Sequence, residues 1–334
     1  MRSESTRVQT NLEKRKDSPE KMIGSESNVA VTMTAILGTM VALIGGLVTL
    51  QTPKVHKEGD MQSTFLPCEK LQPSKYAYEM FVLWYTPLWI ACFGAIIAFQ
   101  LYEDFSAATY NMVCGGLALP LLLQPIILPS AGFNSPDQQR PLAKRYATKA
   151  NLWLAVYSFI GNYWYTHYFY SVLKAEYTMP ATRLNNVPIA MFLATHFYFS
   201  SYHVFSNALL RKVVTTYEPN ILRTTLFLGI ILVFSYFTAF METLTISSFP
   251  YYSFEDRDMA YTVGSAFYGI YFIVSFPGFF YFDEDVDNEK ETARKVDLWG
   301  TVVSSCGHGM MILTLLDFVR LSLGIPLVVG ELNS

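Results

Sequence analysis

Charged residues are scarce in this sequence. Only 15% of its 334 residues are Asp, Glu, Lys or Arg, whereas an average soluble domain carries roughly 25%. The net charge is −3 and the basic residues form no dense block, so the sequence lacks the basic surface that follows nucleic-acid phosphates. Nucleic acid is therefore not expected as a partner, and the composition points towards a membrane protein.

Cysteine and histidine are also few. The four cysteines form no C-x-x-C pair, the spacing typical of zinc or dithiol sites. The five histidines lie at least seven residues apart, unlike the closely spaced histidines that hold two irons in membrane lipid desaturases. Dinucleotide, Walker and G-x-S-x-G motifs are absent as well. These absences predict neither a metal site nor a bound cofactor.

The sequence contains long apolar runs instead. Hydrophobic residues make up 51% of the chain, and the mean hydropathy is +0.25. A helix needs about 20 predominantly apolar residues to cross a bilayer, and eight stretches approach this length. They are residues 29–50, 78–101, 106–129, 151–173, 188–210, 224–246, 261–282 and 299–322. The predicted fold class is all-α, a polytopic membrane helix bundle of about seven core transmembrane helices with one additional N-terminal apolar helix.

The chain divides into five segments. A polar tail over 1–28 precedes the first apolar helix at 29–50, which lacks the pattern of a cleaved signal peptide and is predicted to be an uncleaved span or anchor. A polar linker follows over 51–75. The core membrane domain covers 76–326, and a short tail covers 327–334.

The loops between these helices alternate in basic content. The richer set comprises 51–77, 130–150, 211–223 and 283–298, and the poorer set comprises 102–105, 174–187 and 247–260. The richer set carries 14 Lys and Arg residues and the poorer set carries 3, so the positive-inside rule places the richer set in the cytosol. The basic N-terminal tail would lie on the opposite side in an eight-span count, which leaves the role of the first apolar helix open.

Ionisable groups inside membrane helices are costly and are therefore functional candidates. Glu242 is the only carboxylate in its apolar stretch, and burying a carboxyl that has no role is expensive. His196, His203 and Asn207 fall at i, i+7 and i+11, which places them on one helical face. The alternative is that these histidines only hydrogen-bond neighbouring helices together.

Aromatic and polar residues also crowd the fourth and seventh apolar stretches. The candidates there are Asn162, Tyr163, His167, Tyr168, Tyr268 and Phe272. They predict an aromatic, partly polar cavity. The alternative for the tyrosines is the interfacial aromatic belt found near the ends of membrane helices.

Short motifs in the core domain occur in a specific order. They include Gly161-Asn162-Tyr163, Thr166-His167-Tyr168-Phe169, Tyr202-His203-Val204, Glu242-Thr243 and Phe249-Pro250-Tyr251-Tyr252. In these motifs, and over about residues 76–326, the chain resembles the cycloeucalenol cycloisomerase family of cyclopropyl sterol isomerases. The N-terminal 75 residues lie outside this resemblance.

The resemblance implies a reaction and a location. The family opens the 9β,19-cyclopropane ring of a sterol such as cycloeucalenol without a cofactor and yields a Δ8 sterol such as obtusifoliol, in the endoplasmic reticulum membrane. An acid must protonate carbon 19, and a base must remove the proton at carbon 8. The implied partners are a sterol substrate and the lipid bilayer, and the sequence identifies no protein partner.

Residue chemistry suggests which groups perform these steps. Glu242 is the predicted acid, because burial among apolar helices favours the neutral form of a carboxyl. The predicted bases are His196 and His203, followed by His167. Aromatic faces would stabilise the cation by about 0.5–2 kcal/mol each, and asparagine side chains complete the polar lining. The aromatic candidates are Tyr163, Tyr168, Tyr268 and Phe272, and the asparagines are Asn162 and Asn207.

Two loops carry further candidates for substrate binding. Asn185, Asn186, Tyr251, Tyr252 and Asp256 are predicted to hold the sterol 3-hydroxyl or to close the mouth of the pocket. The alternative is a hydrogen-bonded loop lid without substrate contact. Two other functions also fit the sequence, a non-catalytic seven-span sterol or lipid binding or carrier protein and a Δ8–Δ7 sterol isomerase.

Overall fold

The computed structural model describes residues 19–55, 63–247, 249–255 and 257–327. Helices make up most of these residues and only two small sheets accompany them, which confirms the predicted all-α bundle. The helices are α2 (Pro19–Thr49), α3 (Pro73–Ala98), α4 (Ala107–Ile127), α5 (Tyr146–Ile160), α6 (Thr166–Leu173), α7 (Ile189–Thr216), α8 (Ile221–Ser247), α9 (Arg257–Met259), α10 (Ser265–Phe280) and α11 (Leu298–Ser322). Short 3₁₀ turns cover Leu101–Asp104, Pro136–Gln138 and Leu142–Lys144.

Six helices in the described ranges are long and apolar enough to cross a membrane. They are Val29–Thr49, Pro73–Ala98, Ala107–Ile127, Ile221–Thr245, Arg257–Phe280 and Leu298–Ser322. The predicted stretches at 151–173 and 188–210 are helical too, but α5 has only 15 residues. Helix α7 has 28 residues, and its serines, histidines and asparagine make it less hydrophobic than the six. Length and composition therefore identify an integral membrane protein whose more polar helices lie inside the bundle.

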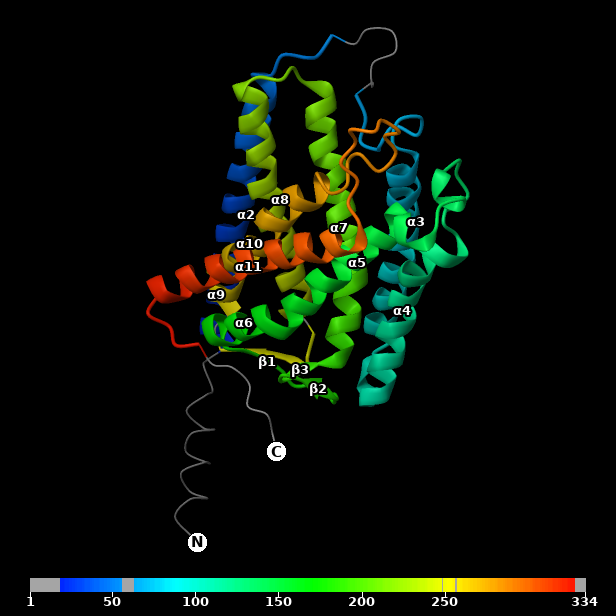
Figure 1. Ribbon diagram of the computed structural model, residues 1–334. Helices are drawn as coiled ribbons and strands as arrows, with labels where there is room; N and C mark the ends of the chain where they lie inside the picture. Colours follow the sequence, from blue (N-terminus) through cyan, green and yellow to red (C-terminus); the bar gives the residue numbers. More distant parts are fainter. Residues whose placement is uncertain (1–18, 56–62, 248, 256, 328–334) are drawn as a thin grey trace, which may run out of the picture.

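Helix α7 lies at the centre of the bundle. It packs against α3, α4, α5, α8 and α10. In Figure 1, α2, α8, α7 and α4 run along the long axis of the molecule, whereas α11 and the α5–α6 segment lie side by side across it. A π-helical turn at Gly161–Tyr165 joins α5 to α6, and a second at Ala260–Gly264 precedes α10. Such turns are rare and often occur at functional sites.

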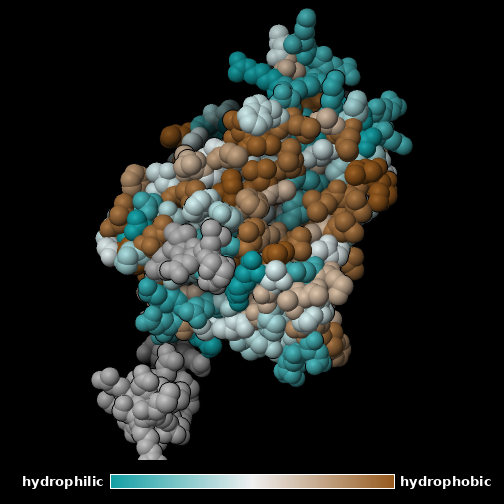
Figure 2. Space-filling view, turned by 60° about the horizontal axis from the view of Figure 1, so that its bottom comes forward, coloured by the Kyte–Doolittle hydropathy of each residue, from teal (hydrophilic) through white to brown (hydrophobic). Residues whose placement is uncertain are grey.

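The outer surface of the bundle is strongly apolar. Figure 2 shows hydrophobic side chains across the middle of one face, with more hydrophilic side chains towards its two ends. Large apolar residues exposed on the long helices include Trp84, Met112, Leu228 and Val303. A soluble monomer rarely exposes so extensive an apolar surface, so this band is the part of the protein expected to contact lipid.

Two small antiparallel sheets lie at one end of the bundle. Strand β1 (Ala175–Tyr177) pairs with β4 (Tyr252–Phe254), so that Tyr177 lies opposite Tyr252. Strands β2 (Arg183–Leu184) and β3 (Val187–Pro188) form a hairpin. Its two turn residues, Asn185 and Asn186, have φ angles of 51° and 60°, the left-handed conformation that two-residue hairpin turns require and that asparagine tolerates. Backbone geometry thus gives both asparagines a structural role.

The basic loops gather at the opposite end. Residue Pro53 forms a β-bridge with Tyr217, and Ser74 hydrogen-bonds Asp287 through its main-chain N–H and its hydroxyl. Arg140 lies 3.0 Å from Asp137 and 2.9 Å from Asp287. Burial raises the pKa of Asp137, although hydrogen bonds from Arg140 act to lower it. These contacts bring all four loops of the richer basic set together on one face of the molecule.

A buried ion pair fastens α3 to α7 in the same half of the bundle. The Arg211 guanidinium donates to both carboxylate oxygens of Glu79 at 2.8 Å, and Asn207 Nδ2 donates to Oε1 at 3.0 Å. The Glu79 side chain is completely buried. Removing one partner of such a pair leaves an unpaired charge inside the protein, which costs far more than the intact pair contributes.

Replacing Glu79 by glutamine is expected to lower the free energy of unfolding by about 3–5 kcal/mol, because Arg211 would remain buried without its counter-charge. The matched control is Asp317→Asn, since the Asp317 side chain is 35% exposed beside Arg320, which is 14% exposed, and a pair that water reaches contributes less than a fully buried one. Titration of the purified protein with a denaturing detergent measures both losses. Equal losses would contradict the role assigned to the Glu79–Arg211 pair.

Candidate functional site

A large cavity lies between α3, α4, α7 and α8 and extends to the sheets at the end of the bundle. Its volume is about 910 Å³, within the roughly 300–1,000 Å³ typical of small-molecule sites. One face of α7 forms its back wall, because Tyr198, Tyr202, Phe205 and Leu209 follow one another at helical spacing. Most of the lining is aromatic or aliphatic, so the cavity suits a large apolar ligand.

Glu242 supplies the only carboxyl group among the described residues that line this cavity. Helix α8 brings it there because Phe234, Thr238, Glu242 and Thr245 share one helical face and all line the cavity. No histidine, lysine or arginine lines it within the described ranges. The cavity therefore combines an extensive apolar surface with a single strongly acidic or basic side chain.

Two tyrosine side chains lie beside the Glu242 carboxyl. They are Tyr202 of α7 and Tyr268 of α10, whose phenols interact with the carboxyl, and both also line the cavity. The second carboxyl oxygen, Oε2, has no hydrogen-bond partner among the described residues. The carboxyl thus lies beside two phenols, and one of its oxygens has no protein partner among the described residues.

The three histidines predicted as bases lie outside the cavity wall. His203 donates from Nδ1 to the Phe199 carbonyl at 2.7 Å, and its Nε2 lies 3.0 Å from Ser275 Oγ. His196 Nε2 lies 3.1 Å from Asn151 Oδ1, and His167 is buried beside the ring of Tyr170. None of the three lines the cavity. The structure therefore does not bring them together with Glu242.

Three of the residues predicted to bind substrate do line the cavity. Asn162 lies in the first π-helical turn, where its Nδ2 donates to Thr195 Oγ1 at 2.7 Å. Tyr252 and Tyr268 line it from β4 and α10. Phe272 lies behind the wall, with its ring centroid 5.3 Å from that of Tyr268. Asn162, Tyr252 and Tyr268 thus contribute polar and aromatic groups to the lining of this cavity.

The other predicted binding residues make structural contacts. Asn207 donates to Glu79, and Asn185 Nδ2 donates to the Tyr163 carbonyl at 2.8 Å. The Asn186 carbonyl accepts from Tyr170 and Arg183. The described residues that line the cavity do not include Tyr163, Tyr168, Asn185, Asn186, Asn207 or Tyr251. Asp256 lies outside the described residues.

The aromatic face of α7 was missed by sequence reasoning. Tyr198 and Tyr202 line the cavity, whereas the polar stripe that contains His196 and His203 points into the helix bundle. Both faces show helical periodicity, which cannot tell which neighbour each face meets. One sequence pattern does indicate this aromatic face. It is the i, i+4, i+7 and i+11 spacing of Tyr198, Tyr202, Phe205 and Leu209.

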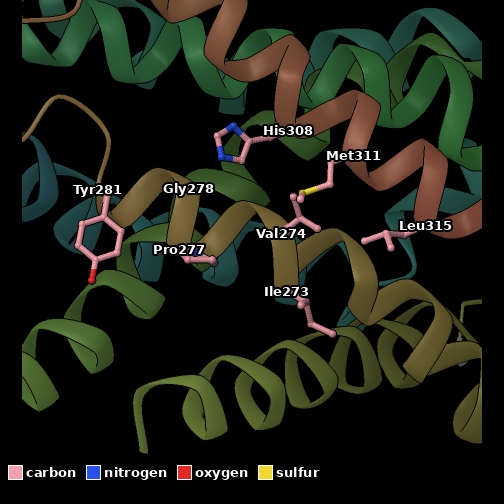
Figure 3. Close-up of a pocket in the computed structure, with 8 residues that line it drawn as sticks. All are labelled: Ile273, Val274, Pro277, Gly278, Tyr281, His308, Met311 and Leu315. Carbon is pink, nitrogen blue, oxygen red and sulfur yellow. The ribbon is translucent and has the colours of Figure 1, made fainter. Parts of the chain in front are cut away.

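A second, shallower hollow lies between α10 and α11 (Figure 3). His308 projects from α11 over Gly278 of α10, and a Cβ atom at Gly278 would lie only 2.2 Å from its Nε2. The remaining lining is apolar except for the Tyr281 hydroxyl. This hollow is about 600 Å³ and contains no carboxyl group among the described residues, so it lacks the acid that the larger cavity has.

Comparison with known proteins identifies the family. The chain is 41% identical over 264 residues to cycloeucalenol cycloisomerase of Arabidopsis thaliana, which covers 78% of this chain and 91% of that protein. The chain belongs to the cycloeucalenol cycloisomerase family. This confirms the family resemblance found in the sequence. Membership of this family identifies the protein as an isomerase. No family model and no solved structure matches it.

Replacing His203 by phenylalanine is expected to destabilise the protein by about 1–3 kcal/mol, because the buried Ser275 hydroxyl loses its partner. Conversion per folded molecule should change little, since His203 lies outside the cavity wall. Ser275→Ala, which removes the other partner, is the matched control for stability. Thermal unfolding and a sterol conversion assay at low temperature measure the two effects. A large loss of conversion without loss of stability would support His203 as the base.

Proposed function

We propose that the protein opens the 9β,19-cyclopropane ring of a sterol such as cycloeucalenol to give a Δ8 sterol such as obtusifoliol. Family membership supports the reaction class, because the Arabidopsis relative carries that name. The observation that carries the proposal is the Glu242 carboxyl, which lines an aromatic cavity in a membrane helix bundle with one oxygen unpartnered. The sterol pathway suggests residence in the endoplasmic reticulum membrane.

In the first step Glu242 acts as a general acid. Its proton passes to carbon 19, the electrons of the bond between carbons 9 and 19 form the new C–H bond, and a methyl group results. A cation remains at carbon 9. A positioned acid contributes about 10²–10⁴-fold to such a step, and the neighbouring phenols of Tyr202 and Tyr268 are placed to stabilise the carboxylate that forms by donating to it.

Aromatic rings stabilise the cation until the second proton leaves. The ring of Phe272 lies 5.8 Å from that of Tyr202 and 5.3 Å from that of Tyr268, which holds both tyrosines in place beside Glu242. Each aromatic face contributes about 0.5–2 kcal/mol when the cation is removed from water. The dense aromatic lining of the cavity thus favours a positively charged intermediate without supplying a competing nucleophile.

In the second step a base removes the proton at carbon 8, and the released electrons form the double bond between carbons 8 and 9. After the first step Glu242 is the one carboxylate on the cavity wall among the described residues. We therefore assign this proton transfer to Glu242 as well, which restores its starting form. The placement of His196, His203 and His167 outside the wall favours this assignment over a histidine base.

Incubation with cycloeucalenol in deuterated water tests the proposed function. Wild-type membranes should produce obtusifoliol with deuterium in the carbon 19 methyl group, because the Glu242 proton exchanges with water between turnovers. Glu242→Gln should lower turnover by about 10²–10⁴-fold and leave sterol binding largely intact. Mass spectrometry of the extracted sterols measures both results.

The matched control is Glu176→Gln, since Glu176 is an exposed carboxylate on the nearby strand β1. It should convert the sterol at the wild-type rate. If the wild-type protein binds cycloeucalenol without converting it, the protein is a carrier and the proposed function is wrong. Normal turnover by Glu242→Gln would place the acid elsewhere.

A further inference from the structure

Several residues that line the cavity have large exposed fractions. On α3 these are Ile90 and Ile97, which are 50% and 44% exposed. On α8 they are Phe237 and Met241, both 42% exposed. Helices α3 and α8 each pack against α7 but are not among the helix pairs that pack closely against each other. With exposed side chains on both, the cavity lacks a protein wall between α3 and α8, across the face of α7.

This opening lies between two apolar helices. Helices α3 and α8 are both long and apolar enough to span a membrane, and the residues at the opening have no charge. Lipid, rather than water, is thus the medium expected beside it. An opening at this level faces the acyl chains of the bilayer.

The end of the cavity near the sheets is closed by packed aromatic rings. Tyr177 and Tyr252 meet with ring centroids 4.9 Å apart across the paired strands β1 and β4. Tyr102 and Phe249 meet with centroids 4.8 Å apart. All four residues line the cavity. A ligand that arrived from the water on this side would have to separate these rings, whereas the side between α3 and α8 needs no such movement.

We infer that the sterol enters the cavity sideways from the bilayer, through a lateral opening bounded by Ile90, Gly94 and Ile97 of α3 and by Phe237 and Met241 of α8. The inference rests on the proposed function for the identity of the ligand. A sterol dissolves in the bilayer, and leaving it for water would expose a large apolar surface at substantial cost. A lateral opening lets the sterol move between two apolar environments.

Gly94 is the residue at which this opening can be closed. It lines the cavity, is exposed, and a Cβ atom built there would meet no atom within 4 Å. A side chain added there would therefore begin in open space at the opening. Gly116 on α4 is a matched position, since it is also exposed with no atom within 4 Å but does not line the cavity.

The test compares substitutions of increasing size at the two glycines. For cycloeucalenol supplied in phospholipid vesicles, kcat/KM should fall progressively from Gly94→Ala through Gly94→Leu to Gly94→Phe, by at least about tenfold at phenylalanine, with a smaller change in kcat. Gly116→Phe should stay within about twofold of wild type. Met241→Trp, which narrows the opening from α8, should repeat the loss. Unchanged kcat/KM in Gly94→Phe, or an equal loss in Gly116→Phe, would overturn the inference.

A binding measurement separates this inference from the proposed function. In the Glu242→Gln background, the association rate of the fluorescent sterol dehydroergosterol from vesicles should fall about tenfold when Gly94→Phe is added, and the amount bound at equilibrium should change little. The same rate with and without Gly94→Phe would exclude the lateral opening even if the wild-type protein is an isomerase. A slower rate would support it even if no sterol is converted.

Discussion

Polar groups on α7 must be paired inside the protein, because the hydrocarbon core of a bilayer offers them no partner. This constraint arranges the rest of the bundle. Four polar residues of α7 form side-chain hydrogen bonds to neighbouring helices and so fasten those helices to α7. The pairs are Arg211 with Glu79 of α3, Ser201 with Thr86 of α3, His203 with Ser275 of α10, and His196 with Asn151 of α5. Helix α7 is thereby fixed on several sides at once.

Fixing α7 in this way leaves its aromatic face free to form the cavity wall. The polar face of the helix bonds neighbouring helices, and the face with Tyr198 and Tyr202 lines the cavity. The carboxyl proposed to react comes from a different helix, since Glu242 lies on α8, beside phenols from α7 and α10. A buried carboxyl that belongs to no ion pair is costly to retain, and this isolation distinguishes Glu242 from Glu79, whose charge is matched by Arg211.

The sequence predicted the helix bundle because apolar runs about 20 residues long are typical of membrane-spanning helices. It also predicted Glu242 as a candidate, since a lone carboxylate in such a run is unusual, and the structure places this residue on the cavity wall. The order of short motifs revealed the family. Periodicity alone could not show which face of α7 meets the cavity, because that depends on how α3, α4 and α8 pack around it. Nor could it show that Asn185 and Asn186 form a hairpin turn, which becomes visible only from their left-handed backbone angles.

The central claim is that Glu242 stands beside the reacting carbons of a sterol bound in the cavity. An experimental structure of Glu242→Gln with bound cycloeucalenol tests this most directly, because the variant should hold the sterol without converting it. The account predicts that the sterol fills the cavity between α3, α4, α7 and α8, with the side-chain amide of residue 242 roughly 3–3.5 Å from carbon 19, the separation of reacting atoms poised for reaction. A sterol bound in the hollow between α10 and α11, or a ring methylene remote from residue 242, would contradict it.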